Sequence, residues 1–487
     1  MDSAMKLNEL LPELGPCTVT GRRDIEVTGI TFDSRMVRPG YLFAALPGGR
    51  ADGHDFVTEA IERGAVAILS QRDVATSNRA TSLRVEDSRS ALARVADCFY
   101  GSPSKEIEII GVTGTNGKTT VCYLLRAMLK EAGRRPALLG TIEYLIGGRS
   151  IPAARTTPEA PYLQAMIRDA VREGCDCLVM EVSSHALEQQ RVGGVAFDVA
   201  VFTNLGSDHL DFHGSIEEYF NAKAPLFTTP GLKRAVVNSD DPWGRKLAAA
   251  IAAPILTYGM GERAMVRALS IESGPGGSRL DIEAEHQRLS VTLPLLGRHN
   301  VYNALAAVGA ALSVGIAPEA IISALSGAKP ARGRLEEVPC ARPYRVFIDY
   351  AHTEEALESA LLAVREGARG RIILVFGCGG DRDKSKRLPM GRTAARLADL
   401  SIVTTDNPRR ENPLEIIAEI SRGFSGTGKR CVQIPDRREA IAAALAESRE
   451  GDIVVVAGKG HERTQEFEST VVPFSDWDVI TELAGQG

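Results

Sequence analysis

The stretch GVTGTNGKTT, residues 111–120, decides the fold of this 487-residue chain. It follows a short apolar run that contains Ile107, Ile109 and Ile110, and it opens into the helix-like segment VCYLLRAMLKEAG. A strand, a glycine-rich turn and a helix in this order gather backbone N–H groups and a helix N-terminus around one point, where they can hold phosphate. The stretch therefore predicts a phosphate-binding loop within an α/β fold.

Lys118 and Thr119 have the positions that the chemistry of such a loop requires. A lysine there reaches the β- and γ-phosphates, and the adjacent hydroxyl ligates Mg²⁺. The strict pattern G-x-x-x-x-G-K-[ST] requires glycine where this chain has Val112, so the match begins only at Gly114. An ordinary glycine-rich turn is the alternative, but the strand before, the hydroxyl and the helix beyond favour a nucleotide site. Its expected contacts are Gly114, Thr115, Asn116, Gly117, Lys118, Thr119 and Thr120.

The composition is that of a soluble globular enzyme. Hydrophobic residues make up 44% of the chain and charged residues 24%, which is typical of such proteins. A chain of this length exceeds what one hydrophobic core supports, so we expect about two to four domains. The net charge of −5 gives no general attraction to nucleic acid or to anionic membranes, so we expect neither nucleic-acid binding nor membrane insertion.

The cysteines and the N-terminal residues predict a cytoplasmic protein. The eight cysteines include no C-x-x-C pair, and several lie in apolar runs beside small residues. This pattern indicates reduced, buried thiols and argues against a disulfide or zinc framework. The opening segment MDSAMKLNELLPELG carries acidic side chains within its apolar stripe and no small-residue cleavage pattern, so we expect no secretory signal.

The order of strand and helix patterns predicts three domains, at residues 1–105, 106–338 and 339–487. In the first, IEVTGITFDSRMVRPGYLFAALPG contains two short alternating runs, DFVTEAIERGA reads as a helix, and VAILS reads as a buried strand. Asp33-Ser34-Arg35 lies between the two runs, where a polar turn is the simplest interpretation.

The second predicted domain alternates strand and helix patterns, as a mostly parallel sheet requires. RTTPEAPYLQAMIRDAVREG predicts a helix that begins with threonine caps and a proline. Glu181 ends one apolar strand, and a later strand ends at Asn204 and leads to His209. Ligands of open α/β sheets gather at the carboxyl ends of the strands, so we expect these side chains near Lys118. Glu181 fits a Mg²⁺ ligand, while a turn cap and a hydrogen-bonded structural histidine are the alternatives.

The third predicted domain repeats this rhythm. RVFIDYAHT, RIILVFGCGGDRDKSKR, LSIVTTDNPRREN and DIVVVAGKGHE are each an apolar strand that ends in a polar cluster. The clusters could be simple polar caps, but four of them rich in Asp, Asn, Arg, His and Glu favour a lined cleft. Before this domain, Asn300 begins a helix and Arg334 lies in a loop, where a helix cap and a solvated arginine are the alternatives.

Nine segments together resemble the Mur ligase family in their order and spacing. They are GTNGKTT, EVSSHALEQQR, NLGSDHLDFHGS, YFNAKAPLF, GRHNVYNALAA, DYAHT, GGDRDKSKR, DNPRREN and GKGHE. The resemblance implies an α/β protein of three domains: an N-terminal α/β domain that binds UDP, a central P-loop ATPase domain with a mostly parallel sheet, and a C-terminal Rossmann-like domain that brings the incoming amino acid. The family's loop has the same Gly-Thr-Asn-Gly-Lys core, so Val112 no longer counts against a phosphate loop.

The resemblance also implies roles for the residues at matching positions. Beside the loop, it implies nucleotide contacts by Asn300, Arg334, Asp349 and His352. It implies metal ligands at Thr119, Glu181, His209 and Lys223, of which the lysine would be carboxylated by CO₂, although a helix-surface lysine is the alternative. It implies a contact to the UDP by Ser34, and contacts to the UDP-sugar and its peptide by Thr156, Thr157, Ser183, Gln189 and Arg191. It implies contacts to the incoming amino acid by Arg387, Asp406, Asn407, Pro408, Arg409, Gly458 and Glu462.

The function implied by the resemblance is that of an ATP-dependent, amide-bond-forming ligase in cytoplasmic peptidoglycan precursor synthesis. The D-glutamyl carboxylate of UDP-N-acetylmuramoyl-L-alanyl-D-glutamate would attack the γ-phosphate of ATP, and an amine would then attack the acyl phosphate. Lys118, Arg334 and Mg²⁺ would offset the negative charge that gathers in both steps. ATP and Mg²⁺ are the expected cofactors, small molecules are the expected partners, and we expect a monomer.

The added amino acid is expected to be meso-2,6-diaminopimelate, because the DNPR sequence ending at Arg409 resembles the family members that add it. A planar arginine can hold the distal carboxylate that L-lysine lacks, and Glu462 suits the distal ammonium. Several alternatives stay open here. They are the same reaction with L-lysine, another P-loop amide ligase such as folylpolyglutamate synthetase, a P-loop mechanical or partitioning ATPase, and a nucleotide-regulated binding protein.

Overall fold

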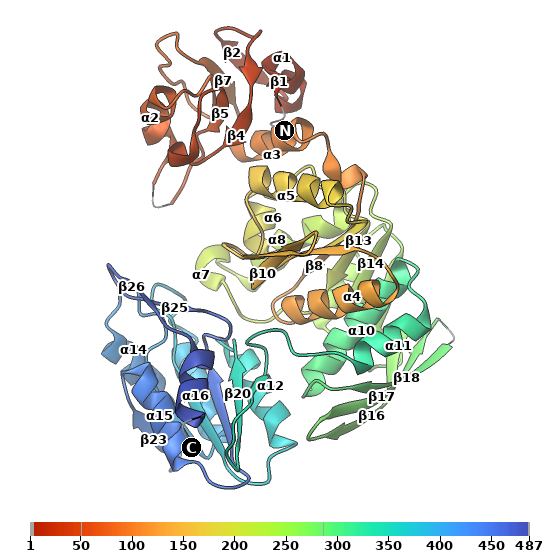
Figure 1. Cartoon of the computed structure of the whole chain (residues 1–487), viewed down its shortest axis with the longest axis vertical. Coiled ribbons are helices and arrows are strands. Elements are labelled where there is room, and N and C mark those ends of the chain that lie inside the picture. Colours follow the sequence, from red (N-terminus) through yellow and green to blue (C-terminus); the bar gives the residue numbers. More distant parts are fainter. Residues whose placement is uncertain (1–3, 50, 286, 486–487) are drawn as a thin grey trace. The chain divides into compact units, whose positions relative to one another are not determined.

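The computed structural model describes residues 4–49, 51–285 and 287–485 (Figure 1). The chain forms two compact units, each made of several stretches of sequence. Unit 1 comprises Met1–Thr113, Arg134–Ala200 and Ala222–Lys233, and unit 2 comprises Gly114–Gly133, Val201–Asn221 and Arg234–Gly487. The outermost residues of the first and third predicted domains, 1–3 and 486–487, lie outside the described residues.

The first predicted strands form a five-stranded sheet in unit 1. Its order is β2-β7-β6-β5-β4, with β2 antiparallel to β7 and the other neighbours parallel. The predicted buried strand VAILS is β6, whereas the predicted helix DFVTEAIERGA is a 3-10 turn followed by α2. Leu42, Leu69 and Leu83 of this sheet share a hydrophobic core with Leu92 of α3. The elements are β1 (Met5–Lys6), α1 (Leu7–Leu10), β2 (Cys17–Thr20), β3 (Glu26–Val27), β4 (Gly29–Thr31), β5 (Tyr41–Ala44), α2 (Val57–Glu62), β6 (Ala67–Ser70), β7 (Thr81–Val85) and α3 (Ser88–Phe99).

Unit 1 also contains strands in the order β11-β10-β9-β12-β8, of which β9, β12 and β8 are parallel. The segment ALLGTIEYLI forms two antiparallel strands, β9 and β10. Helix α5 lies beside α3 (Figure 1). The elements are β8 (Glu108–Thr113), β9 (Pro136–Leu139), β10 (Glu143–Ile146), β11 (Arg149–Pro152), α5 (Ala160–Arg172), β12 (Cys177–Glu181) and α6 (Ser184–Glu188).

The predicted threonine caps of α5 are wrong. The helix begins after Glu159, whose side chain makes no capping hydrogen bond, and Pro161 lies in its first turn as predicted. Thr156 and Thr157 direct their hydroxyls elsewhere: Thr156 contacts Thr141, and Thr157 donates to the carbonyl of Glu181. The hydroxyls therefore join the loop to the end of β12 and are not available to the first turn of the helix.

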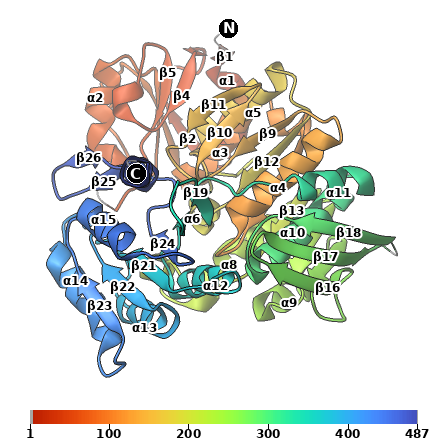
Figure 2. The same ribbon diagram turned by 60° about the horizontal axis from the view of Figure 1, so that its bottom comes forward.

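In unit 2, the strands β14, β15 and β16 are parallel neighbours, and β16-β17-β18 continue as an antiparallel meander. Helices α4, α10 and α11 pack beside one another, and α10 and α11 also pack against these strands (Figure 2). Asn300 lies inside α10, which begins after Gly297, so Asn300 is not the helix cap. The elements are α4 (Lys118–Glu131), α7 (Leu210–His213), β14 (Arg234–Asn238), α9 (Pro242–Ala248), β15 (Ile255–Gly259), β16 (Val266–Gly274), β17 (Gly277–Ala284), β18 (Gln287–Leu293), α10 (Arg298–Ser313) and α11 (Pro318–Ser326). Strand β13 (Val199–Phe202) and helix α8 (Ile216–Lys223) have residues in both units.

The last part of unit 2 is a six-stranded sheet in the order β19-β20-β24-β21-β22-β23, parallel except for β19. The four predicted apolar strands are β20, β21, β22 and β24. Both faces are buried, because Phe347 packs in one hydrophobic core and its neighbour Ile348 in another. This explains why the strands read as continuous apolar runs. The elements are β19 (Glu336–Val338), β20 (Arg345–Asp349), α12 (Glu354–Arg365), β21 (Ile372–Phe376), α13 (Arg387–Leu397), β22 (Leu400–Val403), α14 (Pro413–Ser421), β23 (Arg430–Gln433), α15 (Arg437–Glu447), β24 (Ile453–Ala457), β25 (Thr464–Glu466), β26 (Val471–Pro473) and α16 (Asp476–Ala484).

Three absences bear on function. The eight cysteines are free thiols as predicted, but only Cys122, Cys177 and Cys378 are buried, and the other five are partly exposed. Across residues 4–49, 51–285 and 287–485, no helix has the length and apolar character that a membrane crossing needs. In the same ranges, no three His, Cys, Asp or Glu side chains come together in a group that could hold a metal ion.

Candidate functional site

The predicted phosphate loop has a backbone that only glycine allows at two positions. Gly114 and Gly117 have positive φ values of 142° and 89°. A Cβ on Gly114 would collide with the hydroxyl of Thr203, and one on Gly117 would collide with the side-chain oxygen of Asn303. The glycine spacing seen in the sequence is therefore required by left-handed backbone and by close neighbours.

Side chains from the end of β13 hold the loop in shape. Thr203 Oγ1 donates to the Asn116 carbonyl at 2.7 Å, and the Asn116 N–H donates to Asn204 Oδ1 at 3.0 Å. Lys118 Nζ donates to the carbonyls of Gly114 at 2.9 Å and Thr115 at 2.8 Å. The ammonium of Lys118 thus lies over the loop, where a phosphate ligand would meet it.

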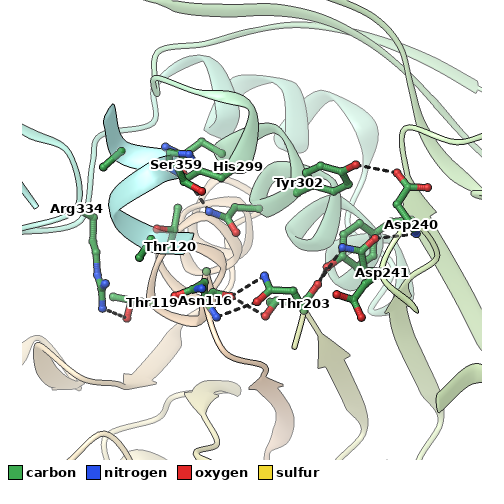
Figure 3. A pocket seen from close by; sticks show the side chains of 18 of the residues that line it. Asn116, Thr119, Thr120, Thr203, Asp240, Asp241, His299, Tyr302, Arg334 and Ser359 are labelled. Atoms are coloured by element: carbon green, nitrogen blue, oxygen red, sulfur yellow. Dashed lines mark hydrogen bonds between the residues drawn. The ribbon is translucent and has the colours of Figure 1, made fainter. Parts of the chain in front are cut away.

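A cavity of about 360 Å³ in unit 2 opens beside this loop (Figure 3). At one side of it, Arg334 Nη2 donates to the hydroxyl of Thr119 at 3.3 Å. The residues predicted for the nucleotide that line it are Asn116, Gly117, Thr119, Thr120, Asn300, Arg334 and Asp349. Gly114, Thr115 and Lys118 form the loop itself, and His352 lines a different cavity. The cavity has both polar and apolar lining, and its volume lies within the range of small-molecule sites.

Burial shifts the pKa of two side chains that line this first cavity, Asp349 and His299. Burial raises the pKa of Asp349, although the charge of Arg334 and the backbone N–H groups of Leu335 and Ala351 act against that rise. Burial also lowers the pKa of His299 to about 4, so its imidazole is neutral at pH 7. A neutral imidazole can donate a hydrogen bond to an uncharged ligand group, or accept one from it, without adding charge to the site.

Asp240 and Tyr302, which no sequence pattern singled out, lie side by side in the lining of this cavity (Figure 3). Tyr302 Oη donates to Asp240 Oδ2 at 2.9 Å, and the same oxygen accepts from the Met260 N–H at 2.6 Å. Asp240 follows the end of β14, so the strand-end rule applied to Glu181 could have identified it. Nothing in the local sequence indicates Tyr302 as its partner.

A second cavity of about 120 Å³ in unit 2 collects the polar clusters at the ends of β20, β21, β22 and β24. It confirms that the clusters line one cleft. The predicted residues in its lining are His209, His352, Asp406, Asn407, Arg409, Gly458 and Glu462. Gly458 has φ 111°, and a Cβ there would collide with the carboxylate of Asp406, which explains the glycine in GKGHE.

Asp208 joins two predicted histidines in the second cavity. Its Oδ2 lies 3.4 Å from His209 Nε2 and 3.7 Å from His352 Nε2. Burial opposes ionisation of this carboxyl, but the hydrogen bond from His352 and the charges of both histidines and Lys386 hold its pKa far below its usual range. Asp208 is therefore a carboxylate at neutral pH, and it lies close to the imidazoles of His209 and His352.

The guanidinium of Arg409 is held from one side. Its Nε donates to Glu466 Oε2 at 2.8 Å and its Nη1 donates to the Gly380 carbonyl at 2.8 Å. Arg409 also has a positive φ of 52°, an unfavourable conformation for a residue with a side chain. Such backbone strain clusters at ligand sites, where the surrounding structure maintains it.

Two residues predicted for the amino acid, Arg387 and Pro408, are not among the described residues that line this cavity. Arg387 is buried, and its guanidinium binds Glu411 at 3.0 Å and Glu419 at 2.9 Å. Arg387 lies in α13, so its guanidinium anchors this helix to two carboxylates. Pro408 precedes Arg409, and its carbonyl accepts from the Glu411 N–H at 3.0 Å.

In unit 1, the residues predicted for the UDP-sugar and its peptide form one network. Arg191 donates to the Thr157 carbonyl at 3.2 Å and to Gln189 Oε1 at 2.7 Å. The Ser183 N–H donates to Thr157 Oγ1 at 3.1 Å, and Thr156 is joined through Thr141. Burial lowers the pKa of Arg191, and the nearby Glu159, 3.0 Å away, opposes this.

Three further predicted residues of unit 1 are buried. Ser34, in the 3-10 turn Ser34–Met36, donates to Glu59 Oε2 at 3.0 Å. Glu181 ends β12 as predicted, and its carboxylate accepts from the N–H and hydroxyl of Thr141. Lys223, the last residue of α8, is only 2% exposed, so the alternative of a helix-surface lysine is wrong.

The sequence matches three domain families of Mur ligases. The Mur ligase family, catalytic domain matches residues 26–100, the Mur ligase middle domain matches residues 112–311, and the Mur ligase, glutamate ligase domain matches residues 333–460. The matches follow one another along most of the chain.

Relatives and solved structures agree with these matches. The chain is 44% identical over 479 residues to the UDP-N-acetylmuramoyl-L-alanyl-D-glutamate–2,6-diaminopimelate ligase of Geobacillus thermodenitrificans, covering 97% of this chain and 98% of the relative. It is 45% identical over 483 residues to the ligase of that name from Syntrophomonas wolfei, covering 98% and 99%. A solved structure of a ligase of that name has a TM-score of 0.70 at 32% identity and covers 99% of both chains. The Mycobacterium tuberculosis folylpolyglutamate synthase complexed with ADP and AMPPCP shares the fold, with a TM-score of 0.63 at 20% identity over 74% of this chain and 91% of the synthase. The chain therefore belongs to the Mur ligase family.

Proposed function

We propose that this ligase joins meso-2,6-diaminopimelate to UDP-N-acetylmuramoyl-L-alanyl-D-glutamate in an ATP-dependent reaction that forms an amide bond. The observation that carries the proposal is the 44% identity, over 97% of the chain, to a relative named for this reaction. The second cavity supports it, since Arg409 and Glu462 can pair with the distal carboxylate and ammonium of the amino acid.

A coupled assay of ADP release against a panel of amino acids tests this function. We expect release only when the UDP-muramyl dipeptide and meso-2,6-diaminopimelate are both present. Equal release with L-lysine would favour the lysine-adding reaction, and release with a folate and glutamate would favour folylpolyglutamate synthesis. ATP hydrolysis without any acceptor would instead favour a mechanical ATPase, and no hydrolysis would favour a nucleotide-regulated binding protein.

The chemistry explains why the first cavity needs cations. A carboxylate acylates poorly, so the D-glutamyl γ-carboxylate attacks the γ-phosphate of ATP, and ADP leaves as an acyl phosphate forms. The amine of the amino acid then attacks the acyl carbon, phosphate leaves, and the amine loses a proton. Lys118 over the loop and Arg334 beside Thr119 would hold and neutralise the phosphate oxygens in both steps.

The donors predicted for Mg²⁺ fit that ion. The hydroxyl of Thr119 and the carboxylate of Glu181 are buried oxygen donors, the kind that Mg²⁺ takes in proteins. We assign His209 and Lys223 as further ligands. When bound, Mg²⁺ would supply charge neutralisation at the transferring phosphate.

We assign the three predicted domains, at residues 1–105, 106–338 and 339–487, to the UDP moiety, ATP and the incoming amino acid. Ser34 would contact the UDP, while the network of Thr157, Ser183 and Arg191 would contact the sugar and peptide. In that network, hydrogen bonds between the predicted residues hold the side chains in place before a ligand arrives. We also propose that the enzyme works as a cytoplasmic monomer, which size-exclusion chromatography with light scattering would test.

Trapping should reveal the acyl phosphate. With ATP and the UDP-dipeptide but no amino acid, borohydride should reduce the activated γ-carboxyl of D-glutamate to the alcohol, detectable by mass spectrometry. The same mixture without ATP is the control and should give no reduced product. Repeated failure to trap, with no transfer of ¹⁸O from the carboxylate into phosphate, would contradict a stepwise path.

Lys223 should carry a carbamate. A neutral, buried lysine amine adds CO₂, and the resulting anionic oxygen would be a ligand for Mg²⁺. In ¹³C-bicarbonate, we expect a carbamate signal by NMR that disappears in Lys223→Ala and persists in Lys233→Ala, whose side chain is exposed. A spectrum without that signal in the nucleotide-bound enzyme would show that the lysine is unmodified.

A further inference from the structure

Lys459 is a fully buried lysine that supports the second cavity from behind its lining. It lies in the turn after β24, between Gly458 and Gly460, and its side chain has no solvent exposure. Its Nζ donates to Asn407 Oδ1 at 3.0 Å and to Glu462 Oε2 at 2.8 Å. Both acceptors line the cavity, whereas Lys459 does not. Burying a charge is costly unless it is paired and hydrogen-bonded, so the contacts of this ammonium account for its position.

These contacts fix which way the Asn407 amide faces. Asn407 Oδ1 accepts from Lys459 Nζ and from the Glu466 N–H at 3.0 Å, while Nδ2 donates to Glu462 Oε2 at 2.8 Å. A flipped amide would place its NH₂ group against the ammonium and the N–H, so two donors would oppose two donors. The buried ammonium therefore determines the orientation of a side chain that lines the cavity.

The same contacts orient the carboxylate of Glu462. Lys459 and Asn407 both donate to Oε2. The side chain of Glu462 remains 28% exposed and lines the cavity, so Oε1 is the oxygen presented to an ammonium ligand. A carboxylate held by one oxygen loses less conformational freedom when the other binds, which favours binding by preorganisation.

We propose that Lys459 is a positioning residue for the incoming amino acid, acting through Asn407 and Glu462. The inference rests on the proposed function, because it takes the ligand of the second cavity to be a diamino acid whose ammonium meets Glu462. Its consequence is specific: loss of Lys459 weakens binding of the amino acid and leaves binding of ATP unchanged. The reason is that neither Asn407 nor Glu462 lines the first cavity. A salt bridge that served only folding would not separate the two substrates in this way.

A double-mutant cycle with full-length protein tests the proposal. The variants are Lys459→Met, Glu462→Gln and the double variant, with Lys429→Met at an exposed position as the matched control. In Lys459→Met, we expect KM for meso-2,6-diaminopimelate to rise by about 10- to 100-fold, the range for losing a group that orients a ligand-binding side chain. KM for ATP should stay within about twofold of wild type, and the control should match wild type for both substrates.

The double variant keeps the test decisive if Lys459→Met folds poorly, because removing both charges leaves no buried charge unpaired. If Lys459 acts through these two side chains, its loss raises KM less in the Glu462→Gln background than in wild type, because the part that acts through Glu462 is already gone. Two results would overturn the inference. One is that the KM increases of the two single variants multiply in the double variant, and the other is an unchanged amino-acid KM in folded Lys459→Met. If the wild-type enzyme showed no ADP release that depends on the amino acid, the proposed function itself would be refuted. The two failures are therefore distinguishable.

Discussion

Replacing Lys118 with alanine is expected to lower kcat by about 10³-fold or more, the scale of removing one charge that stabilises a transferring phosphoryl group. The ammonium of Lys118 lies over the loop, bound to the carbonyls of Gly114 and Thr115. Single-turnover ADP formation with saturating substrates measures the effect. The fold should remain, because the loop is also held by bonds from Thr203 and Asn204.

Lys130→Ala is the matched control for this experiment. It lies on the same helix, α4, but its side chain is exposed, so its turnover should equal that of wild type. Thermal unfolding of the two variants separates loss of chemistry from loss of structure. Near-normal turnover of folded Lys118→Ala would disprove the phosphate-loop assignment.

Arg409→Ala is expected to lower kcat/KM for meso-2,6-diaminopimelate by about 10²- to 10³-fold, the usual cost of truncating one partner of a hydrogen-bonded charge pair. The guanidinium lines the second cavity and is held by Glu466 and the Gly380 carbonyl, so it is positioned before the ligand arrives. L-Lysine lacks the distal carboxylate, so its kcat/KM should change by less than about threefold. Competition between the two amino acids at equal concentration would measure this loss of discrimination.

Arg410→Ala supplies the comparison for Arg409. The neighbouring guanidinium is 66% exposed and pairs with Asp381, outside the cavity lining. Its removal should leave both amino acids unaffected. Unchanged discrimination in Arg409→Ala, or an equal loss in Arg410→Ala, would show that Arg409 is not the selector.

Local patterns predicted the architecture well where the local backbone conformation or burial permits only one type of residue. The loop glycines were identifiable because the left-handed backbone at Gly114 and Gly117 excludes side chains. Strands β20 and β24 were identifiable because burial on both faces requires continuous apolar residues. The strand-end rule correctly collected Asn407 and Glu462 into one cleft.

Predictions that assigned a partner to a polar side chain were less successful. Thr157 was predicted to cap α5, but its hydroxyl donates to the carbonyl of Glu181, 24 residues away. His352, predicted as a nucleotide contact, lies 3.7 Å from Asp208 in the lining of the second cavity, a neighbour that no local pattern indicated. A hydroxyl or an imidazole can use many partners, and a sequence does not indicate which of them packing brings within reach.

The sequence by itself determined the α/β class, the glycine-rich loop, the family and the polar residues that line the second cavity, because these depend on residue types and spacings along the chain. Only the tertiary structure decided which distant groups meet. Tyr302 donates to Asp240, 62 residues away, and the buried Lys459 donates to Asn407, 52 residues away. Such pairs form because packing removes water and leaves each polar group one nearby partner, a constraint that arises only when the whole chain is folded.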